Sequence, residues 1–304
     1  MRDVVIIGAG PAGMTSAVYA ARKKMDCVVY TNIVGGLAIK SVGIENYMGY
    51  HLISGVELMA KFEEQVAEFN IPIEHKTAEK VTKEGENFTV HLDGGEEVLT
   101  KTVIVATGRS PRNLKIPGEK EFVGKGVTYC ATCDAPLFAK MDVAVIGGGN
   151  AALSSVVQLL DIAGKVYAIS QYGWSADPVL QERVTDASNI EILKGYDIIA
   201  IEGRNSVERL KIKSRKIDEL RELPVRGVFI EIGSEPNSGF VSGLVELNEK
   251  REIVVDCGSR TNVAGLFAAG DVTNVPQKQI IVAAGEGAKA ALAAFEYLIR
   301  LEDK

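Results

Sequence analysis

Two cysteines of the sequence, Cys130 and Cys133, are separated by two residues and are followed directly by Asp134. In a reducing compartment, a Cys-x-x-Cys pair is more often redox-active or metal-binding than structural. The thiolate is the reactive form of cysteine, and the helix-start geometry typical of this spacing lowers the pKa of one thiol. Asp134 could move a proton onto or off that thiolate. These three residues predict a dithiol with redox chemistry.

Zinc binding is the competing interpretation of the same pair, because a structural zinc site takes four ligands. The other cysteines, Cys27 and Cys257, stand in apolar, strand-like segments and are expected to be small buried side chains. The three histidines, His51, His75 and His91, are scattered along the chain. Too few ligands remain for zinc, and no metal is predicted.

Residues 8–13 (Gly-Ala-Gly-Pro-Ala-Gly) fit the pattern G-x-G-x-x-G between an expected strand at 3–7 and an expected helix at 14–24. The glycines permit a tight turn and a close approach of the backbone to a pyrophosphate, which binds the free N–H groups at the helix start. This first glycine turn predicts dinucleotide binding. The acid that usually binds the adenosine ribose is missing after the next strand, where Thr31 or Asn32 could make a neutral hydrogen bond instead.

A second glycine turn, residues 147–152 (Gly-Gly-Gly-Asn-Ala-Ala), fits G-x-G-x-x-A after an expected strand at 142–146 and before an expected helix at 150–163. NADPH would need arginines after the following strand and NADH would favour a carboxylate, but residues 170–175 carry no charge. Two interpretations stay open: the turn binds a nicotinamide nucleotide, or the fold is kept without its ligand. The residues that would contact the nucleotide are Gly147, Gly149, Asn150 and Ala151.

The strand–turn–helix units around both glycine turns predict the fold class, which is α/β with two Rossmann-like (ββα-type) dinucleotide-binding domains. Linker-like stretches rich in proline, glycine and serine lie at 109–118 and 233–243. We therefore expect a discontinuous outer domain made of residues 1–113 and 242–304. A central domain at 114–241 would carry the Cys-x-x-Cys pair.

A further buried strand is expected at 261–271, and it ends in Gly270 and Asp271. Asp271 would face a helix start, where the ribityl chain or the pyrophosphate of a flavin would be contacted. The alternative is that Asp271 caps the N-terminus of a helix.

The 304-residue chain is 46% apolar and 24% charged with a net charge of −6, which is typical of a globular protein and unlike a nucleic-acid binder. Its longest apolar stretch, residues 280–299, is interrupted by Glu286, Lys289 and Glu296, so no membrane span is expected. The N-terminus has glycines where a signal peptide would have an unbroken apolar helix. The expected location is the cytoplasm.

These elements together resemble the low-molecular-weight thioredoxin reductase family, which includes the flavoprotein subunit of alkyl hydroperoxide reductase. The resemblance spans essentially the whole chain, and its most specific part is the Cys-Ala-Thr-Cys-Asp core between two dinucleotide folds. The segments that carry it are GAGPAG at 8–13, GG at 35–36, IENY at 44–47, ATG at 106–108, YCATCDAP at 129–136, GGGNAA at 147–152, GLFAAGD at 265–271 and PQKQIIVAAGEGAKAA at 276–291.

The resemblance implies FAD in the outer domain, an NAD(P)-binding-like central domain and a homodimer. Electrons would pass from a donor to the flavin and then to the dithiol, with Cys133 facing the flavin, Cys130 attacking the partner's disulfide and Asp134 as the acid–base group. Such enzymes rotate one domain against the other, and the two linker stretches suit that hinge. The residues that would contact FAD are Gly8, Gly10, Pro11, Ala12, Gly13, Thr31, Gly36, Asn46, Ala106, Thr107, Gly108, Gly270, Asp271, Lys278, Gln279 and Ile280.

Three positions depart from the family pattern: no arginine-rich NADPH stretch follows Ser170, Ala135 replaces a glycine, and Thr31 lies near the expected adenosine acid. Relatives that take electrons from reduced ferredoxin look similar at 129–136 and 53–58. The C-terminal part looks nearer to the alkyl hydroperoxide reductase flavoprotein, whose donor is NADH. The sequence lacks that protein's thioredoxin-like extension, so a separate thioredoxin- or glutaredoxin-like carrier is the expected partner.

The predicted function is therefore an FAD-dependent thioredoxin-disulfide reductase whose donor is reduced ferredoxin or NADH rather than NADPH. One alternative is an NADH-dependent flavoprotein reductase of a peroxiredoxin system. Another, from a different class, is a flavin-bearing redox sensor without turnover, which would have no need of an acid beside the dithiol.

Overall fold

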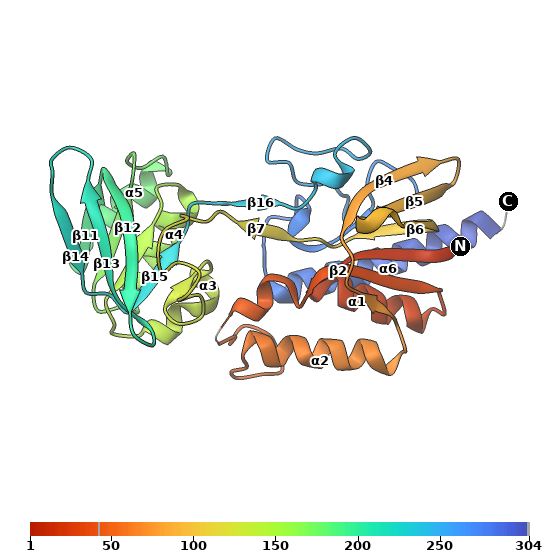
Figure 1. Ribbon diagram of the computed structural model, residues 1–304, viewed down its shortest axis with the longest axis horizontal. Helices are drawn as coiled ribbons and strands as arrows, with labels where there is room; N and C mark the ends of the chain where they lie inside the picture. Colours follow the sequence, from red (N-terminus) through yellow and green to blue (C-terminus); the bar gives the residue numbers. More distant parts are fainter. Residues whose placement is uncertain (42, 303–304) are drawn as a thin grey trace.

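The computed structural model describes residues 1–41 and 43–302. The chain forms two lobes that are joined by a pair of extended strands, β7 (Arg109–Pro111) and β16 (Ser234–Pro236) (Figure 1). Both ends of the chain lie in the same lobe, on the side that faces away from the other lobe (Figure 1). This lobe is the discontinuous outer domain, and the predicted fold class is confirmed.

The outer domain is built on a seven-stranded sheet. Its strands are β1 (Arg2–Ala9), β2 (Cys27–Val34), β3 (Ile73–Glu74), β4 (Ala78–Glu84), β5 (Asn87–Leu92), β6 (Glu97–Val105) and β17 (Leu266–Ala268). Their order is β3-β2-β1-β6-β5-β4, and β17 pairs with β6 in parallel, with Leu266 level with Val103. The pairs β1–β2 and β1–β6 are also parallel, which sets the carboxyl ends of these strands at one edge of the sheet.

The outer domain has three α-helices: α1 (Pro11–Arg22), α2 (Gly55–Glu68) and α6 (Ile280–Glu302). α1 and α6 pack closely, because Gly287 of α6 lets the two backbones approach and its carbonyl accepts a 2.9 Å hydrogen bond from the Ser16 hydroxyl of α1. The opposite face of the sheet is covered by apolar residues of the segment after β16, including Val241, Val245 and Ile253.

The central domain contains a five-stranded parallel sheet in the order β11-β10-β9-β15-β8. Its strands are β8 (Val127–Thr128), β9 (Val143–Ile146), β10 (Val166–Ser170), β11 (Ile190–Lys194) and β15 (Gly227–Ile230). The helices are α3 (Ala131–Asp134), α4 (Asn150–Leu160) and α5 (Pro178–Thr185), and a separate antiparallel sheet is formed by β12 (Tyr196–Gly203), β13 (Val207–Ser214) and β14 (Leu220–Leu223).

The linker stretches pair with each other: β7 and β16 are antiparallel, with Arg109 opposite Pro236 and Pro111 opposite Ser234. The sequence predicted irregular connections here. Two-stranded pairing gives the connection more definite geometry than a loop, while leaving it narrow enough to bend.

Two local expectations were wrong. Cys257 was expected to be buried in a strand but is exposed in a turn. The Asp256 carboxylate accepts the N–H groups of Gly258 and Arg260 at 2.8 and 2.9 Å, and these bonds stabilise that turn. The strand expected at 261–271 is limited to β17, since the residues before it turn through the hydrogen bond from Leu266 to the carbonyl of residue 263. No helix of the described residues is long and apolar enough to cross a membrane.

Candidate functional site

The dithiol lies at the start of a short helix in the central domain. Cys130 and Cys133 form a disulfide, with their Cα atoms 5.3 Å apart. Cys130 caps α3, and its sulfur accepts the backbone N–H of Cys133 at 3.2 Å. A sulfur in this position is the one whose thiolate would be stabilised on reduction. The structure thus places the two cysteines in the helix-start geometry that their spacing predicted.

Asp134 closes the same helix and is almost fully buried, with 4% of its surface exposed. The Thr128 hydroxyl donates a hydrogen bond to its Oδ2, and its Oδ1 has no hydrogen-bond partner among the described residues. Burial raises the pKa of Asp134 to about 6, although the bond from Thr128 opposes this rise. A carboxyl that titrates near neutral pH beside a dithiol can both give and take a proton.

The dithiol segment faces the outer domain. Leu137, in the 3-10 helix that follows α3, lies so close to Gly43 that a Cβ on that glycine would be 3.2 Å from the leucine Cδ2. Beside this contact, the Lys40 ammonium lies 5.6 Å from the centre of the Tyr129 ring. The side chains on both sides of Cys130 and Cys133 therefore meet the part of the outer domain that follows β2.

The first glycine turn has the geometry that a pyrophosphate needs. Gly8 has a positive φ of 106°, and a Cβ there would lie 2.4 Å from the Ala106 carbonyl oxygen. A Cβ on Gly13 would lie 1.8 Å from the Gly8 carbonyl oxygen, which leaves α1 packed directly on the turn. Apart from its two chain neighbours, no heavy atom of the described residues lies within 4 Å of a Cβ position on Gly10, and α1 begins at Pro11 with no side-chain cap. The open approach to uncapped N–H groups fits the pyrophosphate of FAD.

Several other expected FAD contacts gather around this turn. Gly36 lies beside Gly10, since a Cβ on it would be 3.4 Å from the Gly10 Cα. Asn46 donates to Gln279 at 3.1 Å, which joins the segment after β2 to the start of α6, where Ile280 is the first residue. A Cβ on Gly270 would lie 3.0 Å from the Ala12 Cβ, so the start of α1 also meets the end of β17.

The residues that follow β6 are hydrogen-bonded to Asn237, which follows β16. Thr107 donates its hydroxyl to the Asn237 carbonyl at 2.7 Å and its own carbonyl accepts the Asn237 amide at 2.9 Å, while Gly108 accepts the Asn237 N–H at 3.0 Å. Thr31 is buried, and its hydroxyl donates to the carbonyl of Ile33 at 2.8 Å. The Thr31 hydroxyl is therefore already used by a backbone carbonyl at the end of β2, and a ligand would have to compete with that carbonyl for its proton.

Asp271 lies in the 3-10 helix η5 (Gly270–Val272), next to the first glycine turn. Burial raises its pKa, and the nearby charges of Lys278 and Arg109 act in the opposite direction. A partly buried carboxylate held beside positive charge can accept hydrogen bonds from the hydroxyl groups of a ribityl chain. The donor set at this edge of the sheet thus fits FAD.

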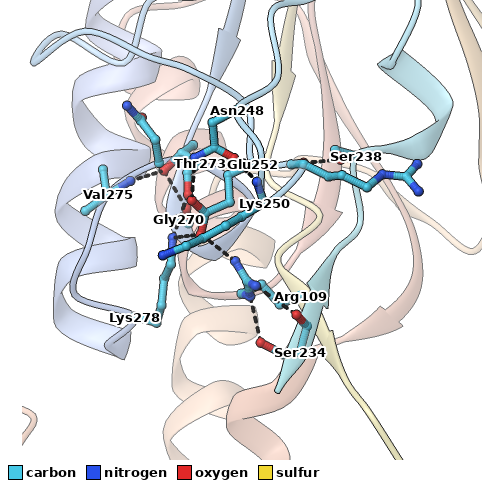
Figure 2. A network of polar contacts seen from close by, with 12 residues as sticks. Arg109, Ser234, Ser238, Asn248, Lys250, Glu252, Gly270, Thr273, Val275 and Lys278 are labelled. Carbon is cyan, nitrogen blue, oxygen red and sulfur yellow. Dashed lines mark hydrogen bonds and ion pairs between the residues drawn. The ribbon is translucent and has the colours of Figure 1, made fainter. Parts of the chain in front are cut away.

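A network of buried charges, which the sequence did not predict, connects this region to the linker strands (Figure 2). Arg109 of β7 pairs with Glu252 at 2.7 Å and donates to the hydroxyl and carbonyl of Ser234 in β16 at 2.8 and 2.9 Å. Lys278 lies 3.3 Å from the same Glu252 carboxylate and donates to the Thr273 carbonyl at 2.5 Å. One buried carboxylate therefore holds both the linker pair and the approach to α6.

The second glycine turn borders a cavity of about 830 Å³, a size that ligand sites commonly have. The four residues that were expected to contact a nucleotide all line it: Gly147, Gly149, Asn150 and Ala151. The segment after β10 lies over the turn, because the Gly148 carbonyl accepts the N–H groups of residues 175 and 176 at 2.7 and 3.1 Å.

Charged side chains reach this cavity from a distant part of the sequence. Asp197 of β12 lines it and accepts a 2.7 Å hydrogen bond from Gln171, which follows β10. Arg215 lies 3.6 Å from the Asp197 carboxylate and stacks over the Tyr172 ring at 4.6 Å. The segment after β10 is uncharged, as the sequence shows, but the fold brings two acids, Asp197 and Glu231, into the cavity lining. The pairing of β12 with β13 places Arg215 beside Asp197.

The family model for pyridine nucleotide-disulphide oxidoreductases matches residues 2–287. The chain belongs to this family. The family implies both a flavin and a pyridine nucleotide as its cofactors.

Two curated relatives are 40% identical to this family member over 98% of its length: an alkyl hydroperoxide reductase subunit of Pseudomonas putida and the NADH dehydrogenase of Bacillus subtilis (strain 168). The chain spans 58% and 59% of these two relatives, respectively. Among solved structures, thioredoxin reductase from Streptococcus pyogenes matches with a TM-score of 0.94 at 34% identity, covering 99% of both chains. The ferredoxin-flavin thioredoxin reductase from Clostridium acetobutylicum matches with a TM-score of 0.54 at 34% identity, covering 98% of both chains.

Proposed function

We propose that this flavoprotein reduces the disulfide of a thioredoxin-like protein through Cys130 and Cys133, with a donor other than NADPH. The observation that carries the proposal is the arrangement around α3. Two cysteines form a disulfide there, beside a buried Asp134 whose pKa is about 6. The same segment contacts the outer domain through Leu137 and Gly43. The likeness to a thioredoxin reductase at 99% coverage supports the same interpretation.

The FAD contacts proposed for the outer domain are the residues that gather around the first glycine turn, together with Asp271 and the Asn46–Gln279 pair. Bound FAD would supply two electrons to the disulfide. The reduced Cys130 thiolate would then attack the partner's disulfide, forming a mixed disulfide and releasing one partner thiolate. Cys133 would displace the partner from Cys130 and restore the disulfide.

Asp134 would deliver the proton that the leaving thiolates need. Because its carboxyl is half-protonated near pH 6, it can hold a proton next to Cys133 and give it up without a large penalty. In the dithiol cycle, two electrons and two protons pass to the partner, so a group that stores one proton beside the sulfurs serves this chemistry directly.

The cavity at the second glycine turn favours NADH or no nucleotide over NADPH. The Asp197 carboxylate and Gln171 lie together there, and a carboxylate suits a ribose 2′-hydroxyl but repels a 2′-phosphate. Arg215 already pairs with Asp197 and stacks on Tyr172, so a 2′-phosphate would have to compete for it. Each charged hydrogen bond lost is worth about 1.5–3 kcal/mol.

Reduced ferredoxin is the other donor that we propose, on the likeness to a ferredoxin-flavin thioredoxin reductase over 98% of the chain. The donor is tested by mixing the FAD-loaded protein anaerobically with NADPH, with NADH and with reduced ferredoxin. We expect the flavin absorbance to bleach with NADH or ferredoxin. Bleaching at micromolar NADPH would contradict the interpretation of Asp197.

The second candidate function is an NADH-dependent flavoprotein reductase of a peroxiredoxin system. It is favoured by the 40% identity to the Pseudomonas putida alkyl hydroperoxide reductase protein over 98% of the chain. A separate thioredoxin- or glutaredoxin-like carrier would then link the dithiol to the peroxiredoxin. Reconstitution of NADH oxidation with hydroperoxide, carrier and peroxiredoxin distinguishes this function from a general thioredoxin reductase.

The role of the dithiol is tested with Cys130→Ser. This variant should retain FAD, since Cys130 lies in the central domain and the proposed FAD contacts lie in the outer one. It should lose reduction of a thioredoxin disulfide with every donor, because the attacking sulfur is gone. Full activity of Cys130→Ser would contradict the proposal. The homodimer implied by the resemblance stays a prediction.

A further inference from the structure

A second buried carboxyl, that of Glu231, lies beside the dithiol. Glu231 directly follows β15, and β15 pairs in parallel with β8, the strand that leads into the dithiol segment. Phe229 lies level with Thr128, so two residues further along each chain Glu231 and Cys130 leave neighbouring strands at the same edge of the sheet. No sequence pattern connects these two positions.

The contacts of Glu231 lead directly to the dithiol helix. Its carboxylate accepts a 2.9 Å hydrogen bond from the Ser155 hydroxyl of α4 and faces the backbone N–H of Ala131, the first residue of α3. The backbone N–H of Glu231 itself is held at 2.8 Å by the Ile146 carbonyl at the end of β9. The carboxyl is thus fixed on the sheet and reaches the residue next to Cys130.

Two consecutive backbone N–H groups at the dithiol therefore face two different buried carboxyls, the first of them through a hydroxyl. The Cys130 N–H donates to the Thr128 hydroxyl at 3.2 Å, and that hydroxyl in turn donates to Asp134. The next N–H, that of Ala131, faces the Glu231 carboxyl. Together these bonds fix the backbone on both sides of the Cys130 Cα, and so the direction of its sulfur.

A carboxyl at this place is costly for the folded protein. Burial raises the pKa of Glu231 to about 6, although the bonds from Ser155 and Ala131 favour the ionised form. An uncharged side chain at the end of a buried strand would avoid that cost. Groups that are buried at such a cost beside reacting atoms are commonly found at functional sites.

We propose that Glu231 is a positioning residue of the dithiol, which holds the Ala131 backbone and keeps negative charge next to Cys130. The proposal rests on the proposed function, in which Cys130 and Cys133 are the redox pair. Through the Ala131 N–H, Glu231 sets the alignment of the two sulfurs. Through its charge, it opposes ionisation of Cys130 and so keeps this thiol from reacting before a partner docks.

The charge effect is tested by alkylation of Cys130 with iodoacetamide from pH 5 to 10 in the FAD-loaded Cys133→Ser background, where Cys130 is a free thiol. Glu231→Gln removes the charge and keeps an acceptor for Ala131. We expect the midpoint of the pH–rate profile to fall by roughly 0.5 to 1 pH unit. Other charges that face the segment, those of Asp134, Lys40 and Glu119, are the same in both proteins.

The alignment effect is tested with the intact dithiol, reduced with dithiothreitol and mixed with dithiobis(nitrobenzoate). The first thiolate releases one thionitrobenzoate and forms a mixed disulfide, and the second thiolate displaces the other thionitrobenzoate and closes the protein disulfide. Glu231→Ala should slow the second release about tenfold, because the sulfurs lose their alignment. Glu231→Gln should recover most of that loss.

The matched control is Glu191, a carboxyl of the central domain that lies on β11. It pairs with Lys165 at 2.7 Å and with Arg221 at 2.6 Å. Glu191→Gln and Glu191→Ala should leave both the alkylation midpoint and the second release unchanged. An unshifted midpoint in Glu231→Gln, with an unchanged second release in Glu231→Ala, would refute the proposal. Neither readout needs a donor or a protein partner, so the proposed function can fail while the role of Glu231 stands.

Discussion

The carboxyl of Asp134 has one oxygen on the Thr128 hydroxyl and the other without a partner among the described residues. This half-satisfied state is unstable for a buried anion and acceptable for a neutral acid. It explains why burial outweighs the hydrogen bond and why the pKa lies at about 6 instead of near the ordinary aspartate value of about 4. The buried Asp134 carboxyl therefore costs the folded protein stability at neutral pH.

Asp134→Asn should show this cost directly. The folded protein holds the Asp134 proton up to about pH 6, whereas the unfolded chain loses it near pH 4, so the wild-type free energy of unfolding falls as the pH rises between these values. Asparagine cannot ionise, so the variant should be more stable than wild type at pH 7, by roughly 1–3 kcal/mol, and less different at pH 4. Urea unfolding at both pH values measures the difference.

The same variant should lose most of its disulfide reductase activity, because the proton store is gone. Glu191→Gln serves as the control, since it removes a carboxylate that is paired with Lys165 and Arg221 and whose pKa is lowered, first of all by the Lys165 hydrogen bond. If the difference in unfolding free energy between Asp134→Asn and wild type were the same at pH 7 and pH 4, that result would contradict the raised pKa of Asp134.

At this scale the sequence predicted the candidate dithiol and its acid but not their surroundings. Cys130, Cys133 and Asp134 lie close together in the chain, so their spacing alone was enough for that prediction. Glu231 and Asp197 reach the dithiol and the cavity only through sheet pairing between distant strands. A single sequence has no local pattern for contacts of this kind.

Among the elements, the first glycine turn shows how little space separates α1 from the end of β1. The Gly13 position leaves no space for a side chain, since a Cβ would meet the Gly8 carbonyl oxygen at 1.8 Å. Any larger residue must push α1 away from the turn, and the uncapped N–H groups at its start would move with it.

Gly13→Ala should therefore purify without its yellow colour or with much weaker FAD binding. The reason is displacement of α1 rather than a loss of helix propensity, because alanine is the better helix former. Gly285→Ala is the matched control. Gly285 also lies in a helix, α6, but apart from its chain neighbours and the backbone of that helix, no heavy atom of the described residues lies within 4 Å of its Cβ position. The flavin-to-protein absorbance ratio measures the outcome, and equal ratios in both variants would contradict the tight packing.

The linker strands are anchored by a buried ion pair at one end only. Arg109 and Glu252 are 12% and 11% exposed, whereas Arg112 and Glu235, at the other end of the same strand pair, are 59% and 67% exposed. Arg109 also binds Ser234, so it ties both linker strands to the outer domain (Figure 2). Bending of the connection is therefore expected on the central-domain side of Arg109.

Arg109→Ala should destabilise the protein by about 1–3 kcal/mol, because Glu252 would lose one charged hydrogen bond and keep only Lys278 and Asn248 as partners. Arg112→Ala, which breaks an exposed pair, should cost no more than about 1 kcal/mol. Thermal unfolding of the two variants side by side measures the difference. Similar losses in both would show that the Arg109 pair does not anchor the linkers.

The sequence predicted the linkers, the two glycine turns and the order of the domains, because glycine, proline and apolar runs are local signals. It did not predict that 109–111 and 234–236 pair with each other, nor the extra sheet of β12, β13 and β14. The ends of strands such as β17 were also missed, since a turn begins inside the apolar run.

On the scale of the whole molecule, the orientation of the two domains decides which surface the dithiol meets. The Streptococcus pyogenes and Clostridium acetobutylicum structures share 34% identity and at least 98% coverage with the chain, yet their TM-scores are 0.94 and 0.54. A difference in domain orientation lowers the score of a two-domain match without changing either domain. In this structure the dithiol segment meets the outer domain through Leu137 and Gly43. Under the proposed function, this is the orientation in which the dithiol would receive electrons, and a rotated orientation would present it to the protein partner.

Locking this orientation should separate the two half-reactions. Gly43→Cys and Leu137→Cys place thiols at the domain contact, and Cys257→Ser removes the exposed thiol that would compete for a short bis-maleimide linker. While Cys130 and Cys133 are oxidised, they are protected from the linker. The linked protein should still transfer electrons from photoreduced flavin to the dithiol, but it should reduce a thioredoxin disulfide at least about tenfold more slowly, because the dithiol cannot swing outward. The unlinked triple variant is the control, and thioredoxin reduction at an equal rate by the linked protein would show that the partner reaches the dithiol without domain rotation.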